Sequence, residues 1–454
     1  DLKERYNLIV SFPFKISSDV IELLKLSAVI PLLNYAIFAK EIQISFSLTE
    51  RSFSFLEYLK KIASIEIFAN KLASPNKLLI SRYSQSLSEL DKDFLDNLAE
   101  LNVRISEDEH FIKNGNNPKS VVLLVGGGKD SLTSYGLLKE AKFDVYPIYI
   151  NESGRHWLTA KKSYDFLITH DPNTLKIWTN IDRVYSFFNR NLGILVRNFT
   201  KIKSDYYPIQ DLLYPFHVLL ASIVCIEKGC GNIAMGNEYD YSDSFLKIIN
   251  GIPTFGGIYD QSYIFERDMS EFLSFINVSV WSPIRPLSGF LVQKILVKRY
   301  PLLFRYQMSC HSPIRRGKDI LHCGTCKKCS RILLYLLALK ADYTLLGLNS
   351  NHIDTLNKRL LSGDFSFDYK RIIQHCLYLL RDSEILSIKV SEDYPFAEYI
   401  HVDGVNAPIN FAPSHIVESL LPLYERDAKG YIKISSFGYL NQLKNFGWRR
   451  ALVL

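Results

Sequence analysis

The stretch SVVLLVGGGKDSLTSYGLL, residues 120–138, decides how the chain is interpreted. Its first part, residues 121–125, has the near-continuous apolar character of a strand that is buried on both faces. Three glycines follow, and glycine allows positive φ angles and a close approach between a ligand and the backbone. Asp130 or Ser131 then begins a helix. The stretch therefore predicts a strand, a tight turn and a helix N-terminus whose backbone N–H groups point at one place.

An anion is the ligand that suits this turn. Backbone N–H groups and the positive end of a helix attract phosphate, and Lys129 adds a point charge. Two common nucleotide motifs are excluded, because a Walker A loop has four residues between its first glycine and its Gly-Lys pair, and the dinucleotide fingerprint is GxGxxG. A turn with only a structural role is the alternative. The residues assigned to the expected anion site are Gly126, Gly127, Gly128, Lys129, Asp130 and Ser131.

Composition fits a globular protein of two or three domains. The chain has 454 residues, of which 47% are hydrophobic, and its charges are scattered. The longest apolar run, residues 212–226, is too short and too polar to span a membrane, and no leader pattern follows residue 1. We therefore expect a cytoplasmic protein.

Residues 294–331 form a basic segment, with ten Lys or Arg and one acid. Such a segment suits phosphate ligands, nucleic acid or an acidic protein surface, and the alternative is a solvated face without a ligand.

Periodicity divides the chain into three regions. Residues 1–117 are expected to form an accessory α+β domain, and residues 340–454 have mainly helical spacing. Between them, residues 118–339 alternate strands with helices, which predicts an α/β domain with a doubly wound parallel sheet. The expected strands of this middle region are 121–125, 145–150, 175–179, 233–235 and 278–281, and its main helices are 131–140, 212–228 and 289–298.

Four of the seven cysteines lie close together in sequence, within residues 309–329. Two overlapping CxxC pairs and one more distant cysteine supply four thiolates, which is enough for a closed tetrahedral zinc site. Disulfides are rare in the cytoplasm, and a redox pair would not need four thiols. An iron–sulfur cluster is the rival interpretation. His311 or His322 could also replace one of the cysteines as a metal ligand. The predicted zinc ligands are Cys310, Cys323, Cys326 and Cys329.

Together these motifs resemble a known superfamily. GGGKDS, residues 126–131, is similar to the SGGKDS loop of the PP-loop ATP pyrophosphatases, whose fold is of the adenine nucleotide alpha hydrolase type. The cysteine pattern C-x12-C-x2-C-x2-C follows some 180 residues later, as in the QueC family of 7-cyano-7-deazaguanine synthases. The stretches AMGNEYDYSDS (234–244), WSPIRPLSGFLVQKIL (281–296) and YQMSC (306–310) are also similar to that family. The resemblance covers about half of the chain and implies ATP, Mg²⁺ and Zn²⁺ as cofactors.

The resemblance also implies a reaction. Members of this family adenylate the carboxylate of 7-carboxy-7-deazaguanine, let ammonia displace AMP, and use a second ATP to dehydrate the amide to a nitrile. Asp130 or Asp240 would bind Mg²⁺. The residues with implied catalytic roles are Lys129, Asp130, Ser131 and Asp240, and those implied to contact the deazaguanine are Asn237, Glu238, Asp240 and Ser242.

Three departures from the family pattern stand out. Gly126 occupies a position where serine is usual, which removes one hydrogen bond to phosphate. Gln210 and Asp211 replace an Arg-Asn pair, so another cation, Arg183 or Arg267, is expected to hold ATP. A longer insert, residues 245–268, replaces the usual substrate loop.

The terminal regions favour a macromolecular acceptor over ammonia. QueC-like proteins of some anti-phage (CBASS-type) operons join a deazaguanine carboxylate to an amine of a partner protein. We therefore expect an AMP-forming carbon–nitrogen ligase. Its expected partners are a 7-deazaguanine and a protein acceptor. A membrane is not expected as a partner, and nucleic acid is expected less than a protein. Three alternatives stay open: a nitrile-forming synthase of queuosine or archaeosine precursor biosynthesis, a tRNA sulfurtransferase, and an inactive, zinc-stapled interaction module.

Overall fold

The structure is a computed structural model of the chain. It describes residues 4–73, 76–106, 116–154, 157–202, 209–239, 247–254, 258–364, 370–403 and 407–434. The described α-helices are α1 (Ile21–Leu33), α2 (Glu50–Ile67), α3 (Ser81–Ser88), α4 (Lys129–Glu140), α5 (Trp157–His170), α6 (Ile181–Asn191), α7 (Leu213–Lys228), α8 (Tyr263–Leu273), α9 (Gly289–Arg299), α10 (Pro301–Phe304), α11 (Lys327–Ala338), α12 (Ser350–Leu361), α13 (Lys370–Leu379) and α14 (Ser414–Glu425).

Among the described residues, six strands form the central sheet, and four pairs of strands form small separate sheets. The central strands are β1 (Val10–Ser11), β4 (Asn117–Leu124), β5 (Asp144–Asn151), β6 (Leu175–Thr179), β7 (Cys230–Ala234) and β10 (Ser279–Trp281). The pairs are β2 (Glu41–Thr49) with β3 (Glu100–Ser106), β8 (Lys247–Ile249) with β9 (Ile252–Thr254), β11 (Ile314–Arg316) with β12 (Asp319–Leu321), and β13 (Ile400–Asp403) with β14 (Tyr431–Ile434).

The order of the central strands is β1-β6-β5-β4-β7-β10. All neighbours are parallel except β1, which pairs antiparallel with β6 at the edge. The five strands predicted for the middle region are therefore confirmed close to their predicted bounds, and so are the three predicted helices, as α4, α7 and α9. The fold is mixed α/β with a parallel sheet at its centre.

The strand order reverses between β4 and β7. From β4 the chain adds β5 and β6 on one side of the sheet, then returns to add β7 and β10 on the other side. In register, Val122 of β4 faces Ile233 of β7, and Leu123 faces Ala234. At such a reversal the connections leave the sheet toward opposite faces, which opens a crevice at the carboxyl ends of the two strands. The segments that follow β4 and β7 therefore meet at the place where a parallel sheet binds its ligand.

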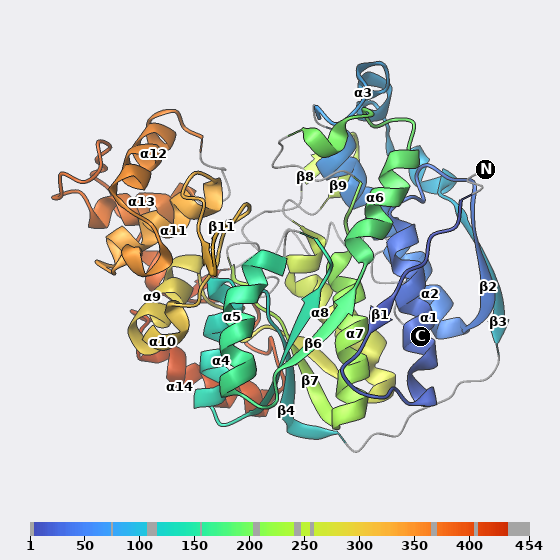
Figure 1. Ribbon diagram of the computed structural model, residues 1–454, viewed down its shortest axis with the longest axis horizontal. Helices are drawn as coiled ribbons and strands as arrows, with labels where there is room; N and C mark the ends of the chain where they lie inside the picture. The colour runs from blue at the N-terminus through green and yellow to red at the C-terminus, as the bar shows by residue number, and fades with distance from the viewer. Residues whose placement is uncertain are drawn as a thin grey trace.

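Alternate residues of the strands pack into two hydrophobic cores, one on each face of the sheet. Val122, Ile148 and Ile233 belong to the core that includes α1, α2, α6, α7 and α8. Val121 and Leu123 belong to the opposite core, which includes α4, α5, α9, α11 and α14. Figure 1 shows α4 and α5 on one side of the sheet and α1 and α7 on the other. Because both faces are covered, the strands are apolar at successive positions.

The terminal regions share these two cores. Helices α1 and α2 pack into the same core as α7, and β1 extends the central sheet. Helices α12, α13 and α14 belong to the core on the other face. The domain boundaries at residues 117 and 339 stay predictions, but the packing across both is continuous. Within the described ranges, no helix has the length and apolarity that crossing a membrane requires.

Candidate functional site

The glycine turn, residues 126–128, lies at the carboxyl end of β4, where the strand order reverses. Gly127 has φ 80°, and a Cβ there would lie 2.6 Å from the backbone oxygen of Thr159 and 2.8 Å from Ser163 Oγ. Both the backbone angle and the contact with α5 therefore require glycine. A Cβ on Gly126, by contrast, would have no atom within 4 Å. Gly127 thus allows the turn to pack against α5, whereas the space next to Gly126 is open.

This difference makes a matched pair of variants. We expect Gly127→Ala to lower the free energy of unfolding by about 1–3 kcal/mol, because alanine resists a left-handed backbone and its Cβ overlaps a backbone oxygen. Gly126→Ala is the control, with an expected change within about 0.5 kcal/mol. Urea unfolding measures both. Equal losses in the two variants would contradict this account of the turn.

Lys129 begins α4, and its ammonium group is buried between two carboxylates. The residue is 1% exposed, and Nζ forms ion pairs with Asp130 and Glu238. Burial lowers the pKa of Lys129, but the charges of Asp130 and Glu238 outweigh burial and hold the pKa above its ordinary value. Burial raises the pKa of Asp130, but the charge of Lys129 together with hydrogen bonds to Glu238 and Lys129 holds that pKa below its ordinary value. By formal charge, one cation lies between two carboxylates in this cluster, so a phosphate ligand needs further cations here.

Glu238 reaches Lys129 because β7 ends beside β4. Gly236 allows the close approach, since a Cβ there would lie 3.1 Å from Ser131 N and 3.2 Å from the backbone carbon of Asp130. Ser131 is buried in the first turn of α4, and its Oγ donates to the backbone oxygen of Gly128 at 3.3 Å. The structure thus brings together the predicted anion-site residues and one predicted substrate residue.

Asn237 faces the protein interior. Its backbone N–H donates to Ser282 Oγ at 3.1 Å, and its Nδ2 donates to Glu266 Oε1 at 3.0 Å. Glu266 forms a fully buried ion pair with Arg285, whose Nη1 also donates to the backbone oxygen of Glu238 at 3.3 Å. Asn237 and the Glu266–Arg285 pair therefore both help to position Glu238. Sequence reasoning missed Glu266 and Arg285; the available signal was an arginine inside the apolar stretch 281–296.

Tyr239 follows Glu238 and is the last described residue before the gap at 240–246. It contacts the C-terminal region. Its ring stacks on His401 of β13 with centroids 4.1 Å apart, and its Oη lies 3.3 Å from Asp403 Oδ2. The backbone N–H of His401 donates to the oxygen of Pro286 at 2.8 Å. The C-terminal region therefore borders the predicted substrate segment. Two predicted site residues, Asp240 and Ser242, lie outside the described residues.

The residues that replace the Arg-Asn pair lie before α7. Gln210 Nε2 is 3.4 Å from Asp182 Oδ1, and burial raises the pKa of Asp211, which lies 3.8 Å from Lys71 Nζ. Arg267, one of the expected substitutes, pairs with Asp268 at 2.7 Å. The other, Arg183, is exposed on α6. Among the described residues, neither arginine forms an ion pair with Lys129, Asp130 or Glu238, so the expected substitution by Arg183 or Arg267 stays a prediction.

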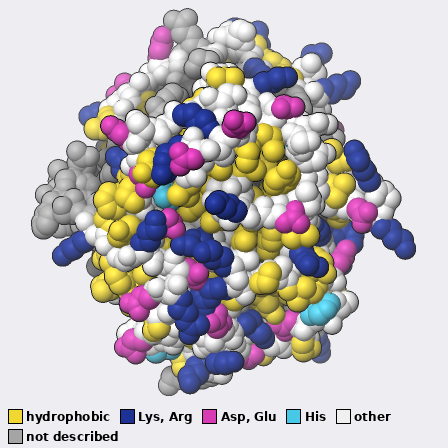
Figure 2. Space-filling model, turned by 90° about the vertical axis from the view of Figure 1, so that its left-hand side faces the viewer, with side chains coloured by type: hydrophobic (Ala, Val, Ile, Leu, Met, Phe, Trp, Pro, Cys, Tyr) yellow, Lys and Arg dark blue, Asp and Glu magenta, His cyan; other side chains and the backbone are white. Residues whose placement is uncertain are grey.

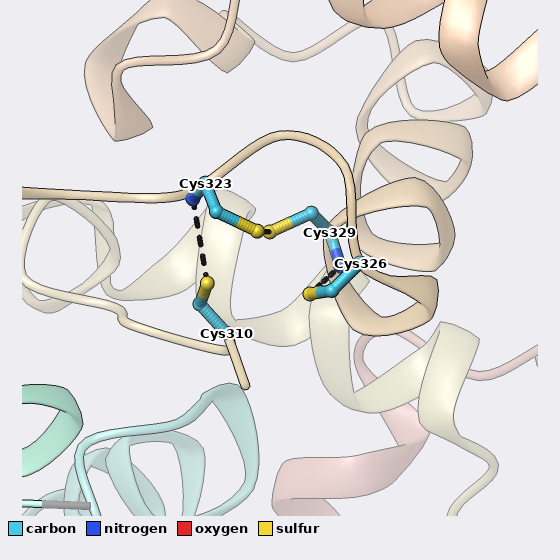
Figure 3. Close-up of side chains that lie close together, drawn as sticks. All are labelled: Cys310, Cys323, Cys326 and Cys329. Atoms are coloured by element: carbon cyan, nitrogen blue, oxygen red, sulfur yellow. Dashed lines mark hydrogen bonds between the residues drawn. The ribbon is translucent and has the colours of Figure 1, made fainter. Parts of the chain in front are cut away.

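The four clustered cysteines form a second centre. Their Sγ atoms all lie within 4.8 Å of one another, and those of Cys323 and Cys329 are 3.9 Å apart (Figure 3). A tetrahedral zinc ion with Zn–S bonds of 2.3 Å separates its sulfur ligands by about 3.8 Å. The donor set and its spacing therefore fit a metal ion such as zinc. The predicted ligand cluster is confirmed as a group that could hold a metal.

Hydrogen bonds link the four thiols to one another. These bonds, from Cys310 first, lower the pKa of Cys323 and lower that of Cys326 to about 6, and they raise the pKa values of Cys310 and Cys329. The backbone N–H groups of Cys323 and Cys329 donate to Cys310 Sγ at 3.3 Å and to Cys326 Sγ at 3.4 Å (Figure 3). Metals bind the thiolate form, so binding of an ion would release the protons that these thiols share.

His322 connects this centre to the glycine turn. Burial lowers the pKa of His322 to about 4, so the ring is neutral. Its Nδ1 bonds to the oxygen of Leu346 at 3.1 Å, and its Nε2 accepts from the backbone N–H of Ser309 at 3.1 Å. Ser309 Oγ in turn accepts from the backbone N–H of Lys129 at 3.3 Å. His322 is therefore engaged with the protein, and the described metal cluster contains cysteines alone.

The basic segment has two different roles. Lys294, Arg299 and Lys327 pair with Glu398, Asp427 and Asp364, and so attach the C-terminal region. Other cations of the segment, Arg315, Arg316 and Lys318, are exposed on the β11–β12 hairpin. Figure 2, which views the side of the molecule where α11–α13 lie, shows Lys and Arg interleaved with acidic and apolar side chains. Much of the positive charge is thus balanced within the protein.

A scan of the chain against protein-family models gives no match, and a search of curated protein sequences gives no significant match either.

Proposed function

We propose that the chain is an ATP-dependent ligase of the PP-loop type. It would adenylate the carboxylate of a 7-deazaguanine acid and transfer the acyl group to an amine of a partner protein, in anti-phage defence. One observation carries this proposal: the glycine turn after β4 and Glu238 after β7 meet through Lys129 at the reversal point of a parallel sheet. Open α/β sheets bind nucleotides at this position.

The chemistry suits the residues present. A carboxylate oxygen of the substrate attacks the α-phosphorus of ATP, and the bond to the β-phosphate breaks to release pyrophosphate. The amine nitrogen then attacks the acyl carbon, AMP leaves, and the nitrogen loses a proton. Lys129 and the N–H groups of the turn would stabilise charge on the departing pyrophosphate. Asp130 and Glu238 offer carboxylate oxygens to Mg²⁺, which would supply the cations that this cluster needs.

Sulfur transfer is a weaker interpretation of the same site. A sulfurtransferase needs a reactive thiol, and four of the seven cysteines lie in the metal cluster. The other three, Cys225, Cys230 and Cys376, are buried. Burial raises the pKa of Cys225 and raises that of Cys230 to about 12. Such thiols stay protonated and unreactive, which favours a ligase.

The C-terminal region supports a large acceptor. It contacts Tyr239, the residue next to Glu238, through His401 and Asp403. Ammonia needs no additional protein surface beside the site, whereas an amine on a partner protein needs a surface that binds this partner.

The proposal is tested by incubating the metal-loaded protein with Mg·ATP, 7-carboxy-7-deazaguanine and either ammonium or the protein products of neighbouring genes. We expect AMP and pyrophosphate in equal amounts, only when the acid is present, and a mass increase on the acceptor. A nitrile formed with ammonium would identify the synthase alternative. If no combination cleaves the α–β bond of ATP, the proposal is wrong.

Gly126→Ser restores the residue that is usual in the PP-loop pattern. A Cβ fits at Gly126, and the added hydroxyl can donate to phosphate. We expect the affinity for Mg·ATP to rise about two- to fivefold, as one further hydrogen bond of roughly 1 kcal/mol predicts. Isothermal titration calorimetry measures it. Gly193→Ser is the control, because a Cβ there also meets no atom within 4 Å and Gly193 lies outside the turn. An equal gain in both variants would contradict the prediction.

A further inference from the structure

Ser309 is a hydroxyl residue that lies against the glycine turn, although it comes from the distant segment before the metal loop. Its Oγ atom lies 3.5 Å from the position that a Cβ would take on Gly128, and it accepts from the backbone N–H of Lys129 at 3.3 Å. The backbone N–H of the preceding residue, Met308, donates to the oxygen of Gly127 at 2.8 Å. Ser309 is half-buried. The first N–H group of α4 is therefore bonded to this serine.

The metal centre lies on both sides of Ser309. The backbone N–H of Ser309 donates to His322 Nε2 at 3.1 Å. Cys310 follows Ser309 and Cys323 follows His322, and both cysteines belong to the cluster whose Sγ atoms lie within 4.8 Å of one another. A metal ion bound there would hold the two segments together. The position of Ser309 beside the turn thus depends on the loop that the metal stabilises.

The hydrogen bonds of Ser309 leave its own proton for a further acceptor. A hydroxyl group has one O–H donor and two acceptor lone pairs. Both lone pairs are engaged, because the Lys129 N–H donates at 3.3 Å and Gln307 Nε2 donates at 3.4 Å. Gln307 Oε1 accepts from Gln293 Nε2 at 2.9 Å, so Ser309 meets the donor side of this amide. Within the described parts of the chain, the Ser309 hydroxyl accepts twice and donates to no protein atom.

The turn motif itself does not supply such a donor. Ser131 Oγ donates to the backbone oxygen of Gly128 at 3.3 Å, which engages its proton within the turn. Position 126, where serine is usual in the PP-loop pattern, is a glycine. Because Ser309 accepts from an N–H group at the positive end of a helix, its O–H is polarised toward an anion. Ser309 is thus placed to donate to a phosphate at this turn.

We infer that Ser309 binds a phosphate group of ATP, with its O–H donating to a phosphate oxygen while its Oγ accepts from the Lys129 N–H. Ser309 would supply the hydroxyl that the turn lacks at Gly126. The segment that carries the metal ligand Cys310 would thereby contribute a residue to the nucleotide site. This inference rests on the proposed function, because it requires the glycine turn to bind ATP.

Calorimetry with Mg·ATP and with Mg·pyrophosphate tests the inference on the metal-loaded protein. Ser309→Thr and Ser309→Val are compared because threonine and valine have nearly the same shape and differ in the hydroxyl. We expect Ser309→Val to bind both ligands about tenfold more weakly than Ser309→Thr, as the loss of one hydrogen bond to a charged group predicts. Ser309→Ala should bind both about tenfold more weakly than the wild type, for the same reason.

Ser312→Ala is the matched control, because it removes an exposed hydroxyl from the same loop. It should change either affinity less than twofold. Metal analysis of each variant separates phosphate binding from support of the loop. One metal ion per chain in every variant, with the losses above, supports the inference.

Three results would overturn the inference. Equal affinities in Ser309→Thr and Ser309→Val would show that the hydroxyl does not contact phosphate. Loss of the metal from Ser309→Val but not from Ser309→Thr would show that the hydroxyl supports the loop instead. Wild-type affinity in Ser309→Ala would contradict the inference and leave the proposed function intact. If the wild-type protein itself binds neither ligand, the proposed function is wrong and the inference fails with it.

Discussion

Lys129→Ala is expected to weaken Mg·ATP binding at least a hundredfold, the largest effect that we predict for one side chain. The ammonium group is 1% exposed and lies between Asp130 and Glu238 at the N-terminus of α4. Its removal takes away the point charge beside the phosphates and leaves two carboxylates to repel them. A hundredfold change corresponds to about 2.7 kcal/mol, within the range for a buried, charged hydrogen bond and its neighbours. Isothermal titration calorimetry gives the affinities directly.

Two further variants make this prediction decisive. Lys139→Ala changes a lysine at the other end of the same helix, 43% exposed and 3.3 Å from Asp171, and should bind Mg·ATP as the wild type does. The double variant Lys129→Ala with Glu238→Gln neutralises one of the two carboxylates that lose their partner, which guards against a folding defect. It should be as stable as the wild type, within about 1 kcal/mol, and still fail to bind. Retained binding in the double variant would show that the turn is not an anion site.

Removal of the metal is expected to have the second large effect. The cysteine loop, residues 310–329, packs around a very small core that consists of Met308, Cys310, Ile320 and Cys329. A loop with so little buried apolar surface depends on its metal, as small zinc modules do. We expect Cys329→Ser, or treatment with a strong chelator, to lower the melting temperature by about 10 °C or more. Mg·ATP binding should be lost as well, because Ser309 would no longer hold Lys129.

Cys376→Ser is the matched control for the metal. Cys376 is also buried, but it lies on α13, outside the cluster. This variant should keep one metal ion per chain and full Mg·ATP affinity. Metal analysis also distinguishes zinc from iron. A metal-free protein that melts and binds nucleotide like the wild type would show that the centre supports neither the loop nor the glycine turn.

Local features of the sequence predicted much of this molecule. Apolar residues at successive positions in 121–125 mark a strand that is covered on both faces, and β4 is packed in that way. The three glycines predicted a turn, and Gly127 does adopt a left-handed backbone against α5. Cysteine spacing predicted a cluster, and the four Sγ atoms do lie together. Each of these properties depends on residues that are near one another along the chain.

The tertiary structure decided which of these pieces meet. Sequence alone cannot tell that β7 lies beside β4, so it could not show that Glu238 pairs with Lys129 across 109 positions. The same limit hid the Arg285–Glu266 pair, the bonds from Ser309 to Lys129 and to His322, and the contact between Tyr239 and His401. Neighbouring residues determine strands, turns and metal ligands through short-range sterics and bond chemistry. Contacts between distant side chains follow from strand order and from the packing of two cores, which only the folded chain establishes.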